Sequence, residues 1–176
     1  MWTAMWSHRS HYRRHRFRCC QCLQCPYQCW WEHLVWRWLL LRVVVAEAIR
    51  TAGGQAIAVP CDVTRDDDVE SAVEAILAEW GQLDLVLANA GYGVAGRMEK
   101  LTLADWERQF QVNVFGLLRT VYAALPHLKK TGGRIGLVGS VMAYLTLPGN
   151  AAYAASKHAV RIIGDNLAAE LQGTGV

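Results

Sequence analysis

The chain has 176 residues, a formal net charge of +3 and 53% hydrophobic residues. This length is enough for one domain with a sizeable core. No apolar run reaches the about 18 residues that a bilayer crossing needs, and the N-terminus lacks the order of a secretory signal, so we expect a cytoplasmic protein without membrane contact.

Residue types are unevenly distributed along the chain. Residues 1–42 carry seven Arg and one acid, whereas residues 43–176 carry eleven Lys plus Arg and fourteen acids. Six of the eight Trp and five of the six Cys lie before residue 43, and all fifteen Gly lie at or after Gly53. A single domain rarely divides in this way. We therefore predict a basic, Trp/Cys/Arg-rich and disordered segment over 1–42, followed by a domain over 43–176.

The N-terminal segment offers two further functions. Cys22, Cys25, Cys29 and His33 could ligate zinc, although the usual long loop between ligand pairs is absent. The run from Arg13 to Arg18 could bind nucleic-acid phosphates. A disordered basic tail explains the same residues more simply. We expect neither a metal nor a nucleic-acid partner.

From residue 43 onward, helix and strand patterns alternate. A helix over 43–52 ends at Gly53 and Gly54, and an apolar strand over 55–59 stops at Pro60. Thr64 can cap the next helix, whose buried stripe is Val69, Val73, Ile76 and Trp80. The following elements are a strand buried on both sides over 83–88, a glycine-rich loop, a helix over 103–128, a strand over 134–139 and a helix over 151–171. The stripe of the 103–128 helix begins at Leu103 and includes Leu117 and Val121. This alternation predicts an α/β fold, a parallel sheet covered by helices.

Two features place a hydroxyl side chain where it could take part in a reaction. Tyr153 and Lys157 lie one helical turn apart on the same face. A free tyrosine has a pKa of about 10, and a neighbouring ammonium favours the phenolate form. Ser140 follows the strand over 134–139, where ligands bind in open α/β sheets. Taken alone, a core tyrosine with a surface lysine and a turn serine are the simpler interpretations.

Two further features contain asparagine at positions where a ligand or a water could bind. Asn89, Ala90 and Gly91 follow a strand, and small residues there let the backbone approach a ligand. Asn113 lies in the middle of the long helix, where a buried amide needs partners such as a water in a proton path. An ordinary strand-ending turn and an exposed asparagine are the simpler alternatives.

In this order, the four features resemble the signature of the short-chain dehydrogenase/reductase family. The step of thirteen residues from Ser140 to Tyr153 fits the family as well. Cys61-Asp62-Val63-Thr64 resembles the family's Asp-Val segment near the adenine. The resemblance covers residues 43–176 and implies a Rossmann-like, doubly wound parallel sheet.

The resemblance also implies an activity, hydride transfer between NAD or NADP and a carbonyl or alcohol substrate. Tyr153 is then the general acid/base, and Lys157 assists it and holds the nicotinamide ribose. Ser140 orients the substrate carbonyl, and Asn113 holds a water of the proton relay. The expected cofactor-binding residues are Asp62, Val63, Asn89, Ala90, Gly91, Tyr153 and Lys157. The helices over 103–128 and 151–171 are expected to pair subunits of a homo-oligomer.

The chain departs from the family in its outer parts. The family begins with a strand and a glycine-rich turn that holds the pyrophosphate at a helix N-terminus, but the first glycine here is Gly53. The first two strands and the last are not recognisable, so we expect an incomplete sheet with exposed edges. The alternative function is therefore a catalytically inactive fragment that lacks the cofactor loop.

Overall fold

The computed structural model describes residues 43–176, which fall into two compact units. Residues 43–60 belong to one unit and residues 61–176 to the other. In the first unit, residues 43–51 are helical, and a turn follows at Gly53, whose φ of 86° suits glycine. The strand predicted over 55–59 is wrong, because the structure has only an isolated bridge at Ala58. A strand needs a neighbour to complete its hydrogen-bond ladder, and the one sheet of the described residues does not include this segment.

The second unit begins with α2, Asp66–Trp80. Val69, Val73 and Ile76 are buried on one face, as the periodicity predicts. The predicted cap is wrong, because Arg65 is the N-cap residue and no side chain caps the helix. The Thr64 hydroxyl donates instead to the Asp62 carboxylate over 2.8 Å. Trp80, at the helix end, is 36% exposed rather than part of the buried stripe.

The sheet of the described residues consists of β1, Leu85–Ala88, and β2, Arg134–Leu137. The strands are parallel, as predicted, with Leu85 opposite Arg134 and Ala88 opposite Leu137. Burial of β1 on both faces was a wrong expectation. Val86 and Ala88 are buried, but Leu85 and Leu87 keep 65% and 48% of their surface exposed. Among the described residues, apolar side chains of α4 and α5 pack on the face of β1 that carries Ala88.

The predicted helix over 103–128 is present, but a π-helical segment lies within it. It runs through α3, Leu103–Phe110, then the π-helical segment η2, Gln111–Phe115, and then α4, Gly116–Thr131. Thr102 starts it with a capping box, because its side chain accepts from the Asp105 backbone and the Asp105 carboxylate accepts from Thr102. The stripe is buried at Leu117 and Val121, whereas Leu103 is 81% exposed on the first turn. The sequence analysis did not predict the π-helical segment.

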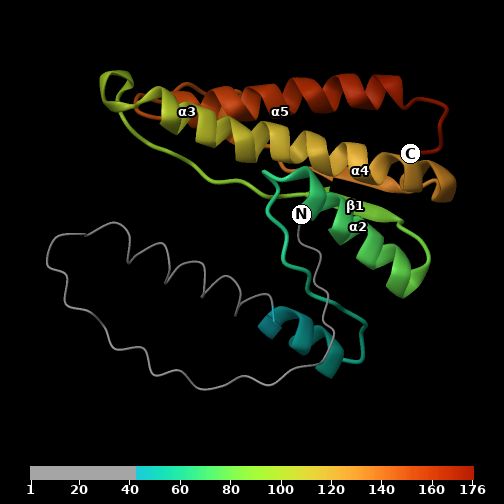
Figure 1. The fold of residues 1–176 in the computed structure, drawn as a ribbon. Coiled ribbons are helices and arrows are strands. Elements are labelled where there is room, and N and C mark those ends of the chain that lie inside the picture. Colours follow the sequence, from blue (N-terminus) through green and yellow to red (C-terminus); the bar gives the residue numbers. More distant parts are fainter. Residues whose placement is uncertain (1–42) are drawn as a thin grey trace, which may run out of the picture. The chain divides into compact units, whose positions relative to one another are not determined.

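The last helix is α5, Ala151–Glu170, which agrees with the prediction over 151–171. It lies alongside the helix formed by α3, η2 and α4 (Figure 1). Two short 3₁₀ helices, η1 over Met98–Lys100 and η3 over Val141–Ala143, lie in the connecting loops. The fold is α/β, with two parallel strands in an open, partial sheet. Within residues 43–176, no helix combines the length and apolar character needed to cross a membrane.

Close packing of α4 on the segment before α2 generates a stability prediction. A Cβ atom at Gly116 would lie 2.7 Å from Val63 Cγ2 and 3.1 Å from the Val63 carbonyl oxygen. We expect Gly116→Ala to lower the free energy of unfolding by about 1–3 kcal/mol, because overpacking forces these groups apart. Chemical denaturation measures the change.

Gly164→Ala is the matched control in the middle of α5. Its Cβ atom would meet only Leu137 Cδ1, at an ordinary 3.4 Å. We expect it to be neutral or to raise stability by up to about 1 kcal/mol, because alanine favours the helix. Equal effects at the two glycines would contradict this account of the packing.

Candidate active site

Lys157 is a buried cation on α5. Only 5% of the residue is exposed, and its Nζ donates to the Val138 carbonyl oxygen over 2.7 Å, just beyond the end of β2. Nζ also lies 5.9 Å from the centroid of the Tyr153 ring, one turn earlier on the same helix. Burial lowers the pKa of the Lys157 ammonium, because loss of water disfavours the charged form. The structure therefore brings the predicted pair together, with Lys157 buried and Tyr153 half-buried.

A cavity of about 450 Å³ opens beside this pair. Its lining includes the two side chains themselves, two asparagine side chains and several glycines from the loops after β1 and β2: Asn89, Gly91, Tyr92, Gly93, Ala95, Val138, Gly139, Asn150, Tyr153 and Lys157. The glycines matter, because a Cβ atom at Gly91 would lie 3.8 Å from Lys157 Nζ and one at Gly93 would lie 3.4 Å from the Tyr153 ring. The backbone after β1 thus lies close to both predicted catalytic side chains.

Asn113 is buried in the π-helical segment η2 and is only 1% exposed. Its Oδ1 accepts from the Tyr92 backbone N–H over 3.0 Å, and its Nδ2 donates to the Tyr92 carbonyl oxygen over 2.9 Å. Nδ2 also donates to Ser156 Oγ over 3.0 Å, and Ser156 Oγ donates to the Tyr153 carbonyl oxygen. A single side-chain amide therefore joins the loop after β1 to the turn of α5 that carries Tyr153.

Sequence reasoning missed Gln109 and Ser156. Both are fully buried. Gln109 Oε1 accepts from the Val94 backbone N–H over 2.7 Å, and its Nε2 donates to the Tyr92 carbonyl oxygen. The available signal was spacing, because Gln109 precedes Asn113 by four residues and Ser156 follows Tyr153 by three, so each lies on the same helix face as a predicted site residue.

Ser140 lies three residues beyond the end of β2, at the N-cap of η3, and it lines a different cavity. This second cavity, of about 220 Å³, is bounded by β2, η3 and α5, and it shares Gly139 with the first. The Ser140 hydroxyl accepts from the Met142 backbone N–H over 3.2 Å at the start of η3. Its hydrogen is thus available to a ligand, because the oxygen is the acceptor in this contact.

The remaining predicted cofactor residues line neither of these two cavities. Asp62 is exposed, and its carboxylate accepts from the Thr64 backbone N–H over 2.9 Å. Val63 is buried against Gly116. Ala90 is half-buried between two residues that do line the larger cavity. Residues 43–176 contain no cluster of metal-ligating side chains, and the Cys22 to His33 ligand set lies outside the described residues.

Known proteins share both the sequence and the fold of this part of the chain. The family model described as short chain dehydrogenase matches residues 41–176. An uncharacterized oxidoreductase of Methylorubrum extorquens is 39% identical over 127 residues, which make up 72% of this chain and 51% of that protein.

Solved structures agree with this match. An alcohol dehydrogenase from the archaeon Thermococcus sibiricus, complexed with 5-hydroxy-NADP, has a TM-score of 0.70 at 29% identity and covers 74% of this chain and 57% of its own. Carveol dehydrogenase from Mycobacterium avium, in complex with NAD, has a TM-score of 0.72 at 28% identity and covers 76% of this chain and 49% of its own. The chain spans about half the length of the curated relatives it matches. It belongs to the short-chain dehydrogenase family.

Proposed function

We propose that the site transfers hydride between NAD or NADP and a carbonyl or alcohol substrate, with Tyr153 as the general acid/base. The observation that supports this most is the pairing of Tyr153 with the buried Lys157 ammonium at the wall of one cavity. The volume of this cavity, about 450 Å³, lies in the usual range of small-molecule sites. The alternative is an inactive member of the family, and the experiments below separate the two.

The donors and acceptors of the cavity fit the nicotinamide end of such a cofactor. The Lys157 ammonium and the amides of Asn89 and Asn150 can bond sugar hydroxyls, and Gly91 allows the close approach of a ring. We assign Ala90 to the same wall, and Asp62 and Val63 to the adenine side. When bound, the cofactor accepts or supplies the hydride at its nicotinamide ring.

The protein then has to move one proton and to fix one oxygen. In alcohol oxidation, the Tyr153 phenolate would take the proton from the substrate oxygen, while the carbon that bears this oxygen gives its hydride to the oxidised cofactor and becomes the carbonyl carbon; reduction reverses both transfers. Lys157 is held at Val138, with its ammonium 5.9 Å from the centroid of the Tyr153 ring. We assign to the Ser140 hydroxyl, whose oxygen accepts from the Met142 N–H, the role of donor to the substrate oxygen from the adjoining cavity. We assign to Asn113 the binding of a water molecule in the proton path.

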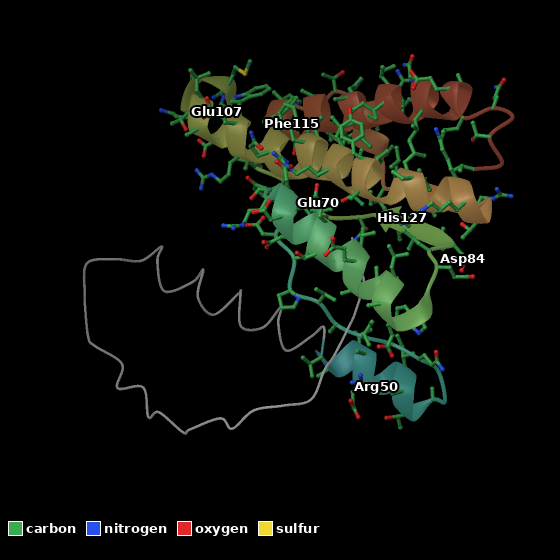
Figure 2. All side chains as sticks on the ribbon, turned by 45° about the vertical axis from the view of Figure 1, so that its right-hand side comes forward. Arg50, Glu70, Asp84, Glu107, Phe115 and His127 are labelled. Carbon is green, nitrogen blue, oxygen red and sulfur yellow. The ribbon has the colours of Figure 1, made fainter. Side chains whose placement is uncertain are left out.

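The proposal includes a homo-oligomer and a cytoplasmic location for the protein. The helices over 103–128 and 151–171 would pair subunits of a homo-oligomer, which is supported by large apolar side chains on their outer faces. Phe115 of η2 is 46% exposed (Figure 2), Tyr122 of α4 is 69% exposed and Ile162 of α5 is 49% exposed. A cytoplasmic location, inferred from the single cysteine Cys61 in residues 43–176, belongs to the same proposal.

Cofactor binding is tested by thermal melts of the whole chain with NADH and with NADPH. At about 100 times the dissociation constant, a ligand that binds only the folded form adds about 2.7 kcal/mol of stability. For a chain of this size, we expect the correct cofactor to raise the melting temperature by about 5–10 °C. A cooperative melt that neither cofactor moves would favour the inactive alternative.

The role of Tyr153 is tested by removing one hydroxyl. Tyr153→Phe should lower kcat about 100-fold to 10,000-fold, because general acid/base catalysis contributes about this much. Tyr122→Phe is the matched control on the exposed face of α4 and should leave kcat unchanged. Steady-state rates of carbonyl reduction check both variants, and similar rates for Tyr153→Phe and Tyr122→Phe would remove Tyr153 from the chemistry.

The lowered pKa of Lys157 predicts a pH dependence of cofactor binding. The ammonium is present below its folded-state pKa and is lost as pH rises through that value, which lies below that of an ordinary lysine. The cofactor-induced rise in melting temperature should therefore shrink between neutral and alkaline pH, before a normal lysine titrates. In Lys157→Met, the rise should be smaller at neutral pH and less dependent on pH. A rise that stays constant up to about pH 10 would contradict this.

A further inference from the structure

The backbone from Tyr92 to Val94 lies in the loop that lines the larger cavity, and within residues 43–176 it pairs with neither β1 nor β2. Its donors and acceptors still need partners, because an unpaired buried peptide group costs stability. The partners are side chains. Asn113 takes both the N–H and the carbonyl of Tyr92, and Gln109 takes the N–H of Val94 and a second position on the Tyr92 carbonyl.

The orientation of the Gln109 amide follows from its surroundings. The Val94 N–H can only donate and the Tyr92 carbonyl can only accept, so Oε1 must face Val94 and Nε2 must face Tyr92. The side chain is 0% exposed, so water does not compete for either contact. Gln109 therefore holds two points of the loop, two residues apart, from a fixed position on α3.

What the loop touches connects Gln109 to the site. Gly91 and Gly93 flank Tyr92, and they are the positions whose Cβ atoms would meet Lys157 Nζ at 3.8 Å and the Tyr153 ring at 3.4 Å. A shift of this loop would therefore change the backbone packing against Lys157 and the Tyr153 ring. Gln109 itself is not among the residues that line the cavity, so its effect on the site must pass through the loop.

We propose that Gln109 is a positioning residue for the reaction, which clamps residues 92–94 so that Gly91 and Gly93 stay packed against Lys157 and the Tyr153 ring. The inference rests on the proposed function for its catalytic consequence, but the clamp can be measured without any ligand.

The test compares Gln109→Met with Thr120→Val. Methionine keeps the length of the side chain but neither hydrogen bond, and Thr120→Val removes a hydrogen bond from an equally buried hydroxyl on α4, whose partner is the Gly116 carbonyl. Amide hydrogen exchange should become about fivefold to tenfold faster at Val94 in Gln109→Met and should not change there in Thr120→Val. Gln109→Glu keeps an acceptor for the Val94 N–H, so the Val94 amide should stay more protected than in Gln109→Met.

The second measurement is the titration of Lys157 by NMR of its labelled side chain, assigned by its absence in Lys157→Met. Burial lowers the pKa of Lys157 in the unmodified chain. In Gln109→Met, hydration through the loosened loop should move this pKa up toward that of an ordinary lysine, whereas Thr120→Val should not move it. A purely structural role for Gln109 would lower the melting temperature without a change in this titration.

The outcomes separate the two proposals. Faster Val94 exchange together with a raised Lys157 pKa supports the clamp. If these changes occur but neither NADH nor NADPH moves the melting temperature of the unmodified chain, the clamp stands and only the proposed function fails. If either cofactor raises that temperature, Gln109→Met should bind it less tightly than Thr120→Val does. Unchanged Val94 exchange and unchanged Lys157 titration in a folded Gln109→Met would overturn the inference.

Discussion

The candidate site depends on how the backbone between β1 and α3 meets its hydrogen-bonding requirement. Tyr92 and Val94 of this loop are half-buried, and within residues 43–176 the loop pairs with neither β1 nor β2. Side-chain amides of Gln109 and Asn113 supply the missing partners from the long helix. Because asparagine and glutamine each carry both a donor and an acceptor, each can bond the backbone as a neighbouring strand would. The geometry near Lys157 is therefore set by side chains on α3 and η2.

The π-helical segment η2 is part of the same arrangement. Such segments displace the residues around them relative to an α-helix and often occur at functional sites. Here the segment carries Asn113, whose amide reaches both the loop and Ser156 of α5. Ser156 in turn bonds the carbonyl of Tyr153. The loop, the central helix and the helix with the tyrosine are thus joined through one buried polar network, so a change in any of them is felt by the others.

Sequence reasoning predicted the features that local patterns determine. The long helices carry their apolar period over several turns, and Asn89, Ser140, Tyr153 and Lys157 follow strand ends or share a helix face. Features that depend on a partner were missed or wrong. The segment over 55–59 needs a neighbouring strand, and burial of Leu85 and Leu87 needs a second covering layer. Gln109 was missed because its burial depends on how α3 packs against the loop and α5, which helical periodicity alone does not specify.

The burial of Lys157 has opposite effects on stability and on chemistry. Removing water disfavours the ammonium, and one carbonyl oxygen, that of Val138, accepts from it. The same burial holds the ammonium in one place, 5.9 Å from the centroid of the Tyr153 ring. A lysine at the surface would cost nothing and would do little for the tyrosine. The proposed function would account for the cost of burying Lys157, because groups with displaced pKa values cluster at functional sites.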